Sequence, residues 1–285
     1  MIVDAHHHAW DGSAPLTWMV GAYAALRRPA RLQDHAIEAS AVGVQASVLV
    51  EGGAPACAEQ GARALLGLAD ASSMVTATVI GLPTAGLADA SLGALLDELG
   101  DAPGGDTLAG VRWGPVDAEA SWAGSEKLAH GAEVLASRDL ALDLLVRSDE
   151  LSGVTTLARR HPNLRIVLDH LAKPPVAAGD GREEWDAWSE GMAAASRCSN
   201  VFVKVSGLVQ RSPVAHRMTD AIEAVAENFG THRLMLGSDW PVCTLAASFH
   251  DTWDLYTSLF SGFSPAERQR VLGGTAREVY RMETS

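Results

Sequence analysis

The sequence contains little cysteine, few aromatic side chains and fewer basic than acidic residues. Its three cysteines, Cys57, Cys198 and Cys243, lie far apart and form no CxxC pair. This excludes zinc ribbons and dithiol redox chemistry, and buried or idle thiols in a reducing cytosol are expected. Thirty-five acidic against 22 basic residues give a formal net charge of -13. Such a charge repels nucleic acid and anionic membranes, so neither is an expected partner.

Long apolar runs and an N-terminal targeting segment are also missing. No stretch approaches the ~18 apolar residues of a membrane span, and the first residues lack the basic segment and apolar core of a signal peptide. No Gly/Ser linker or low-complexity tract divides the 285 residues. We therefore expect a cytoplasmic protein with one domain over residues 1–285, and we leave open whether it is a homo-oligomer.

Short apolar or β-branched runs recur along the chain, and each predicts a strand. The eight runs are Ile2–Ala5, Ala46–Val50, Val75–Ile80, Leu108–Trp113, Leu140–Val146, Arg165–Leu168, Val201–Val205 and Arg233–Leu236. Stretches of helical period lie between them, among them Cys57–Ala71, Ser91–Gly100, Glu126–Ser137, Asp149–Arg160, Glu183–Arg197 and His216–Phe229. Regular β–α alternation of this length predicts the α/β class and a (β/α)8 TIM barrel, with a doubly wound open sheet as the alternative.

The start of one helix is predicted from its capping residues and not from the spacing of apolar residues. Ser264-Pro265-Ala266-Glu267 has the form of a capping box, with proline at the first helical position and glutamate placed to reach back to the cap amide. A terminal helix is predicted to begin there.

In a TIM barrel the chemistry lies where the strands end, and the first run ends in histidines. Strand alternation places Asp4, His6 and His8 on one face and Ala5 and His7 on the other. Two imidazoles two residues apart can bind one cation or one substrate oxygen. The alternatives are a pair of hydrogen-bonded structural histidines and the remnant of an affinity tag, against which the strand-like Ile-Val-Asp-Ala before the triplet argues.

The eighth run ends in Asp239. In a closed barrel the last strand lies beside the first, so closure alone predicts that Asp239 approaches His6 and His8. The alternative is an aspartate that caps a helix or turn.

The sixth and seventh runs each deliver one more ionisable group. His170 shares the face of Ile166 and Leu168 and stands where the apolar pattern stops. This position favours a functional imidazole over a structural histidine that only makes hydrogen bonds. If the valines of the seventh run face the helices, Lys204 points into the barrel. A buried lysine needs a partner, either a carboxylate or substrate in the site or a structural aspartate.

The second and fourth runs end in groups suited to a substrate. Glu51, followed by two glycines, offers a carboxylate for a metal or a sugar hydroxyl. The sequence supports equally well a solvent-exposed glutamate in a loop. Arg112 offers a planar fork of donors for a carboxylate or a polarised carbonyl, with ion pairing at the barrel rim as the alternative. Trp113 supplies a flat apolar wall.

Six motifs in this order resemble the amidohydrolase superfamily, and within it a branch of lactone hydrolases similar to L-fucono-1,5-lactonase, sulfomuconolactonase and 2-pyrone-4,6-dicarboxylate lactonase. The motifs are Asp4–Trp10, Gly110–Arg112, Asp169–Pro174, Lys204–Leu208, Gly237–Pro241 and Gly273–Ala276.

The resemblance implies metal ligands, or their descendants, at His6 and His8, the sixth-strand histidine at His170 and a water-activating acid at Asp239. The fifth run offers no histidine and the fourth offers Arg112, so a binuclear centre is not expected. One divalent cation on these four residues, zinc first, is the expectation, and a metal-independent site is the alternative. Glu51 stands where the branch has glutamine, and Thr275 replaces an asparagine.

The predicted function is hydrolysis of a small lactone derived from a sugar or from aromatic breakdown. Asp239 acts as general base on water, and either the cation or the histidines with Lys204 stabilise the charge on the carbonyl oxygen. Further predicted contacts are Lys173 and Arg112 for a carboxylate or hydroxyls, and Trp10, Trp113 and Trp240 for apolar walls. The alternatives are a non-oxidative decarboxylase of the same superfamily and a non-catalytic barrel that binds a sugar acid.

Overall fold

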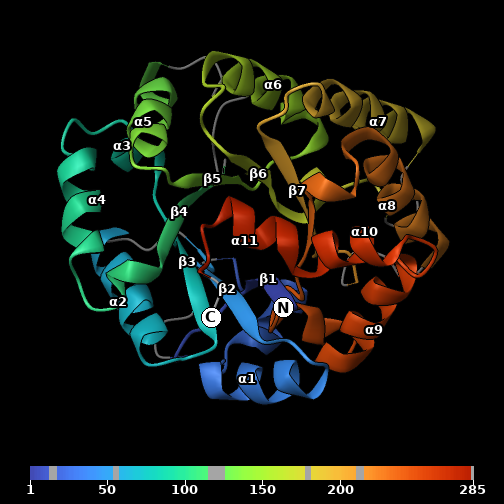
Figure 1. Cartoon of the computed structure of the whole chain (residues 1–285), viewed down its shortest axis with the longest axis horizontal. Coiled ribbons are helices and arrows are strands. Elements are labelled where there is room, and N and C mark those ends of the chain that lie inside the picture. Colours follow the sequence, from blue (N-terminus) through green and yellow to red (C-terminus); the bar gives the residue numbers. More distant parts are fainter. Residues whose placement is uncertain (13–17, 54–57, 115–125, 177–180, 210–214, 284–285) are drawn as a thin grey trace.

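The computed structural model describes residues 1–12, 18–53, 58–114, 126–176, 181–209 and 215–283. Eight parallel strands form one sheet in the order β1-β2-β3-β4-β5-β6-β7-β8 (Figure 1). They are β1 Val3–His7, β2 Ala46–Val50, β3 Val75–Gly81, β4 Leu108–Trp113, β5 Ala141–Leu144, β6 Ile166–Leu168, β7 Val201–Val205 and β8 Leu234–Leu236. All eight predicted strands are confirmed; the first extends two residues further, to His7, and the fifth, sixth and eighth are shorter than predicted.

Helices surround this sheet. They are α1 Leu32–Ala41, α2 Ala58–Asp70, α3 Thr84–Leu87, α4 Leu92–Gly100, α5 Glu126–Ser137, α6 Leu151–Arg160, α7 Arg182–Ser196, α8 Ala215–Phe229, α9 Phe249–Leu259, α10 Pro265–Gln269 and α11 Thr275–Val279. The predicted capping box begins α10, since Ser264 Oγ accepts from the Glu267 amide and the Glu267 carboxylate accepts from the Ser264 amide. The predicted (β/α)8 barrel is confirmed.

The sheet closes through the residues that follow β8. The His8 amide donates to the Trp240 carbonyl at 2.7 Å, and the Asp239 amide donates to the His6 carbonyl at 2.8 Å. His7 and Trp240 form a parallel bridge. The two ends of the chain therefore meet as closure predicts.

Two apolar layers position the strands. Small and branched residues such as Ala5, Val48 and Val79 pack together inside the barrel, and the alternate residues, such as Leu49 and Leu142, pack in a larger cluster with the helices. Residues on neighbouring strands and helices thereby exclude water from both faces of the sheet, which is the pattern of a parallel barrel.

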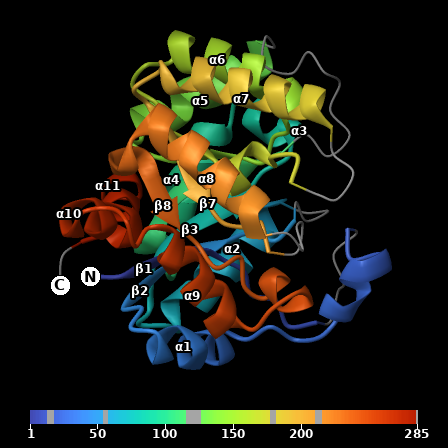
Figure 2. The ribbon, with the colours of Figure 1, turned by 90° about the vertical axis from the view of Figure 1, so that its right-hand side faces the viewer.

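The barrel has one closed and one functional end. Figure 2 shows both termini together with α10 and α11 at one end, and the 3-10 helix Gly21–Leu26 at the other. Figure 1 shows α11 lying across the centre of the barrel. The carboxyl ends of the strands, which carry the chemistry in this fold, open away from α11.

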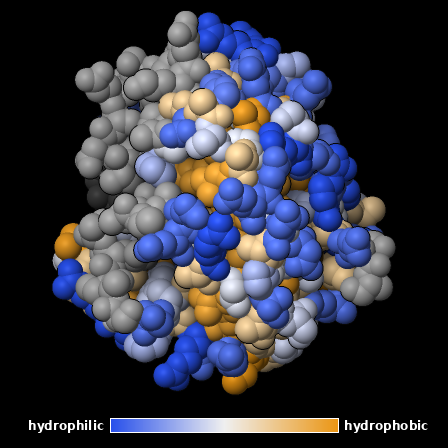
Figure 3. Space-filling view, turned by 90° about the vertical axis from the view of Figure 1, so that its left-hand side faces the viewer, coloured by the Kyte–Doolittle hydropathy of each residue, from blue (hydrophilic) through white to orange (hydrophobic). Residues whose placement is uncertain are grey.

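The face of the molecule seen in Figure 3 carries both hydrophilic and hydrophobic residues. The face over α2 and α4 is mostly hydrophilic, with smaller apolar areas between (Figure 3). Among the described residues, no helix combines the length and the apolar character needed to cross a membrane. Of the three cysteines, Cys198 and Cys243 are free and buried, as predicted, and Cys57 lies outside the described residues.

Candidate active site

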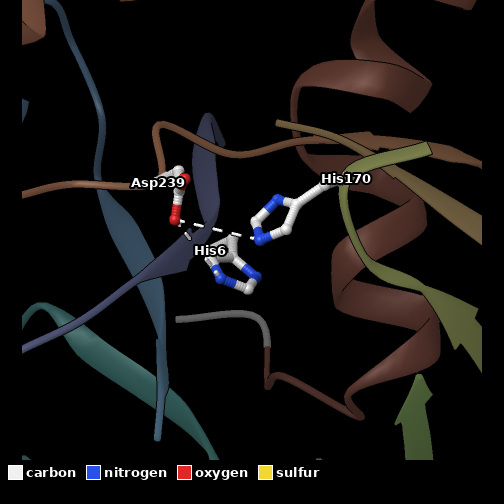
Figure 4. A group of neighbouring side chains, drawn as sticks. All are labelled: His6, His170 and Asp239. Carbon is white, nitrogen blue, oxygen red and sulfur yellow. Dashed lines mark ion pairs between the residues drawn. The ribbon is translucent and has the colours of Figure 1, made fainter. Parts of the chain in front are cut away.

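Asp239 lies at the centre of a group of histidines at the carboxyl ends of the strands. Its Oδ1 lies 3.4 Å from His8 Nε2, 3.7 Å from His6 Nε2 and 4.0 Å from His170 Nε2. Figure 4 shows His6, His170 and Asp239 pointing toward one another from three separate segments of the barrel. The four residues are almost completely buried. The predicted approach of the late carboxylate to the early imidazoles is confirmed.

The other ring nitrogens fix how the imidazoles face. His8 Nδ1 donates to the Val50 carbonyl at 2.8 Å, and His170 Nδ1 lies 2.9 Å from Ser206 Oγ. In both rings the Nε2 atom is thereby left to face Asp239. A partner on one nitrogen sets the tautomer and orientation of the ring.

His6 reaches the centre through an irregularity in β1. The register of β1 against β2 shifts between Asp4 and His7, so simple alternation fails there. Asp4 and His7 both contact His35 of α1, outside the barrel, whereas Ala5 packs inside. The prediction that Asp4 shares a face with His6 and His8, opposite Ala5, was wrong because of this bulge.

His170 reaches the centre through a left-handed turn. Ile166 and Leu168 pack in the outer layer, so a continued strand would have carried His170 outward. Instead residues 170–173 all have φ near +54°, a region that is costly for residues other than glycine. The turn swings the imidazole inward, so the predicted position was right and the predicted reason, alternation, was wrong.

Gly207 leaves room for the His170 ring. Its φ is +65°, and a Cβ there would lie 2.4 Å from His170 Nδ1. Any side chain at this position would therefore displace the ring from Ser206.

We expect Gly207→Ala to lower kcat for the reaction proposed below by about tenfold or more, because displacement of a group that acts in a reaction by about 1 Å costs up to ~10²-fold. The measurement is steady-state turnover beside Gly262→Ala, whose added methyl group meets open space. Equal kcat for the two variants would contradict the role assigned to Gly207.

A buried network of charges lies below the histidines. Lys204 Nζ bonds the carboxylate of Asp143 on β5 and lies 3.3 Å from Asp169 Oδ1 and 3.2 Å from His6 Nδ1. Lys204 is fully buried, as the alternation of β7 predicted. Lys204 thus pairs with buried carboxylates and also lies beside His6, and a role in the reaction stays a prediction.

The lower end of the network was not predicted. Tyr280, which follows α11, donates its hydroxyl to both oxygens of Asp143, at 2.9 and 2.8 Å. Burial raises the pKa of Asp143 to about 6. Burial opposes ionisation of Asp169 too, but Lys204, His6 and Arg112 together outweigh it and hold the Asp169 pKa well below its usual range.

The imidazoles of His6 and His170 are neutral near pH 7. Burial, with the Lys204 charge, lowers the pKa of His6 well below its usual value, and burial lowers that of His170 to about 4. Burial alone would raise the pKa of Asp239, but the surrounding histidines, His170 first, together outweigh it and lower it. The site therefore holds an ionised carboxylate beside the neutral imidazoles of His6 and His170.

The family model of amidohydrolases matches residues 3–282 of the chain. This chain belongs to the amidohydrolase family. It is 32% identical to L-fucono-1,5-lactonase of Burkholderia ambifaria, over 99% of this chain and 96% of that protein.

Solved amidohydrolase structures from Burkholderia multivorans have the same fold along the whole chain. One has a TM-score of 0.91 at 27% identity and covers 99% of this chain and 100% of its own. A second, with bound zinc, has a TM-score of 0.90 at 28% identity and the same coverage.

The donor atoms of this amidohydrolase fit a single metal ion. One atom each from His6, His170 and Asp239 lie within 4.8 Å of one another. His6 Nδ1 lies 3.4 Å from Asp169 Oδ1, and the tautomer with its proton on Nδ1 leaves a lone pair on Nε2. Neutral imidazoles and an ionised carboxylate are the protonation states that metal binding requires.

The polar residues predicted to contact the substrate differ in their surroundings in the structure. Arg112 donates to Asp169 Oδ2 at 2.9 Å and to the Glu51 carbonyl at 2.8 Å. The bond to Asp169 is the ion pair at the barrel rim that the sequence analysis gave as the alternative to substrate binding. Burial raises the pKa of Glu51, which lies near His8 and Arg112. Lys173 is partly buried at the end of the left-handed turn.

Of the three tryptophans predicted as walls, only Trp10 faces a central histidine, with its ring 6.2 Å from that of His8. Trp113 is 2% exposed and packs in the outer layer, on the side of β4 away from Arg112. The Trp240 ring packs 5.5 Å from His35. Trp10 and Trp240 do share a separate pocket of about 240 Å³ beside α1.

Proposed function

We propose that this amidohydrolase is a lactonase, which adds water to the carbonyl of a small lactone and releases a hydroxy acid. The observation that carries the proposal is the ionised Asp239 carboxylate within 4.0 Å of three imidazole Nε2 atoms in a buried site. The 32% identity to a fuconolactonase over 99% of the chain supports a sugar-acid lactone in particular.

Asp239 takes the proton from the attacking water and returns it to the leaving alkoxide. A carboxylate that is ionised across the neutral range is ready to accept that proton. His8 and His170, each held through its Nδ1 atom, fix where the water and the carbonyl meet. Burial of the whole group strengthens each of these interactions because it excludes bulk water.

His6, His8, His170 and Asp239 are proposed to hold one divalent cation, zinc first. A bound cation would polarise the lactone carbonyl as a Lewis acid. Lys204, whose Nζ lies 3.3 Å from Asp169 Oδ1, would hold that carboxylate beside His6 Nδ1 as the charge on the substrate oxygen develops.

Arg112, Lys173, Glu51 and Trp10 are the proposed substrate contacts. Because Asp169 already balances the charge of Arg112 and Glu51 adds a carboxylate, the rim suits hydroxyl groups better than a second anion. Trp10 offers an apolar surface beside His8.

The proposal is tested with a pH indicator and a panel of sugar and aromatic lactones at neutral pH. A lactonase releases one proton per turnover, with the hydroxy acid as the sole product. Release of carbon dioxide from a carboxylated aromatic substrate, with no lactone opened, would identify a decarboxylase instead. Thermal stabilisation by a lactone that is never opened would identify a binding protein.

Metal content is a separate prediction. Protein purified without chelator is expected to hold about one divalent ion per chain, and His170→Ala is expected to lose most of it. The measurement is elemental analysis beside His250→Ala, whose side chain is 60% exposed on α9. Full lactonase activity in metal-free wild-type protein would contradict the proposed cation.

A further inference from the structure

Asp4 is a fully buried carboxylate on the outer side of β1. Its Oδ1 accepts from the Ser238 amide at 2.8 Å and from the His6 amide at 3.3 Å. Its Oδ2 accepts from Ser238 Oγ at 2.6 Å and from His35 Nε2 at 2.9 Å. An ionised carboxylate has about four acceptor sites, so Asp4 uses its whole capacity to join β1, α1 and the end of β8.

Two of these bonds end at the residue directly before Asp239. Ser238 Oγ, which Asp4 holds, also accepts from the Trp240 amide at 3.0 Å, so the backbone on both sides of Asp239 is tied to one hydroxyl. Asp239 itself has φ +58°. A residue other than glycine keeps this conformation only where its surroundings hold it.

The same carboxylate also holds the strand that carries the histidines. Asp4 accepts from the His6 amide, and the Asp239 amide donates to the His6 carbonyl. The bulge that turns His6 inward leaves Asp4 outside, where it can reach the end of β8. The geometry of the centre, 3.4 Å from Asp239 to His8 and 3.7 Å to His6, is thus set by contacts on the far side of β1.

We propose that Asp4 is a positioning residue, which fixes Asp239 relative to the histidines through Ser238 without touching the substrate. The kinetic part of this inference rests on the proposed lactonase function. The structural part does not.

Asp4→Asn tests the inference because it replaces one acceptor oxygen by an amide that faces two donors, Ser238 Oγ and His35 Nε2. We expect kcat to fall by about 10- to 100-fold, as for other groups that orient a catalytic residue, with KM changed by less than about threefold. Ser238→Ala, which removes only the hydroxyl bonds, is expected to lower kcat in the same way by a smaller factor, and it serves if Asp4→Asn does not fold.

Ser47→Ala is the matched control. Ser47 lies opposite Asp4 on β2 and is equally buried, but its hydroxyl contacts His7 and not Ser238. Its kcat should stay within about twofold of the wild type. Equal losses in Ser47→Ala and Asp4→Asn would show a general packing effect and overturn the inference.

A double variant distinguishes positioning from an independent role. If Asp4 acts through Asp239, Asp4→Asn causes no further loss of kcat in the Asp239→Asn background. Losses that multiply would overturn the inference.

Crystal structures separate this inference from the proposed function. Failure of the wild type to open any lactone rejects the function alone. In Asp4→Asn, or in Ser238→Ala, the Asp239 carboxylate is expected to move by about 1 Å, the scale that matters for catalysis. An unmoved carboxylate would overturn the inference whatever the activity.

Discussion

Asp239→Asn is expected to lower kcat for lactone hydrolysis by ~10²- to 10⁴-fold, the contribution of a well-placed general acid–base group. The asparagine amide has nearly the same shape but accepts no proton. KM should change little, because the amide still fits between the imidazoles. The measurement is initial-rate kinetics on the best lactone of the panel, with circular dichroism to show that the fold is kept.

Asp254→Asn is the matched control for this variant. Asp254 lies on α9 with its side chain 63% exposed and pairs only with His250 in the described residues. It should turn over as fast as the wild type. Near-normal kcat in Asp239→Asn would reject the assignment of Asp239 as the base.

Lys204→Met is expected to destabilise the fold by about 3–5 kcal/mol, the usual result of removing one partner from a buried ion pair. The change leaves Asp143 without its cation and Asp169 with only Arg112. Methionine fills most of the space, so the loss comes from charge rather than from a cavity. Denaturant unfolding of the two proteins measures the difference.

Arg63→Met removes an exposed cation of the same kind. Arg63 pairs with Glu59 and Glu98, with its side chain 40% exposed, so its loss should change stability by no more than about 1 kcal/mol. Adding Asp143→Leu to Lys204→Met should recover part of the loss, because the buried charge then disappears. Unchanged stability in Lys204→Met would show that the network is not a structural unit.

Much of the fold could be predicted because this barrel repeats one unit, a short apolar strand followed by a helix. Fully buried strands read as short apolar runs, and the helices between them keep their period, so most bounds agree closely. The capping box at Ser264 was visible because both of its partners lie within four residues. The meeting of His8 with Asp239 followed from closure alone and needed no knowledge of side-chain geometry.

What could not be predicted depends on backbone departures that carry no residue signature. The bulge in β1 moves Asp4 outward, and nothing in the sequence marks it. The left-handed run after β6 consists of histidine, leucine, alanine and lysine, residues that ordinarily avoid that conformation, so only the tertiary structure explains it. The pairing of Tyr280 with Asp143 joins residues 137 positions apart.

Strand alternation carries one further signal, in β4. Arg112 and Trp113 are neighbours on a strand, so alternation already excludes that both face the site. The structure places Arg112 at the rim of the site, on Asp169 and the Glu51 carbonyl, and Trp113 in the outer layer.

The most direct test of the central claim is a crystal structure of Asp239→Asn with an unreacted lactone. The claim is that the ends of the chain meet to form one hydrolytic site. It predicts the ring carbonyl carbon beside the substituted side chain and the Nε2 atoms of His6, His8 and His170, with a water within about 3.5 Å of that carbon. A lactone bound elsewhere, such as the pocket beside Trp10 and Trp240, with its carbonyl turned away from the histidines, would contradict it.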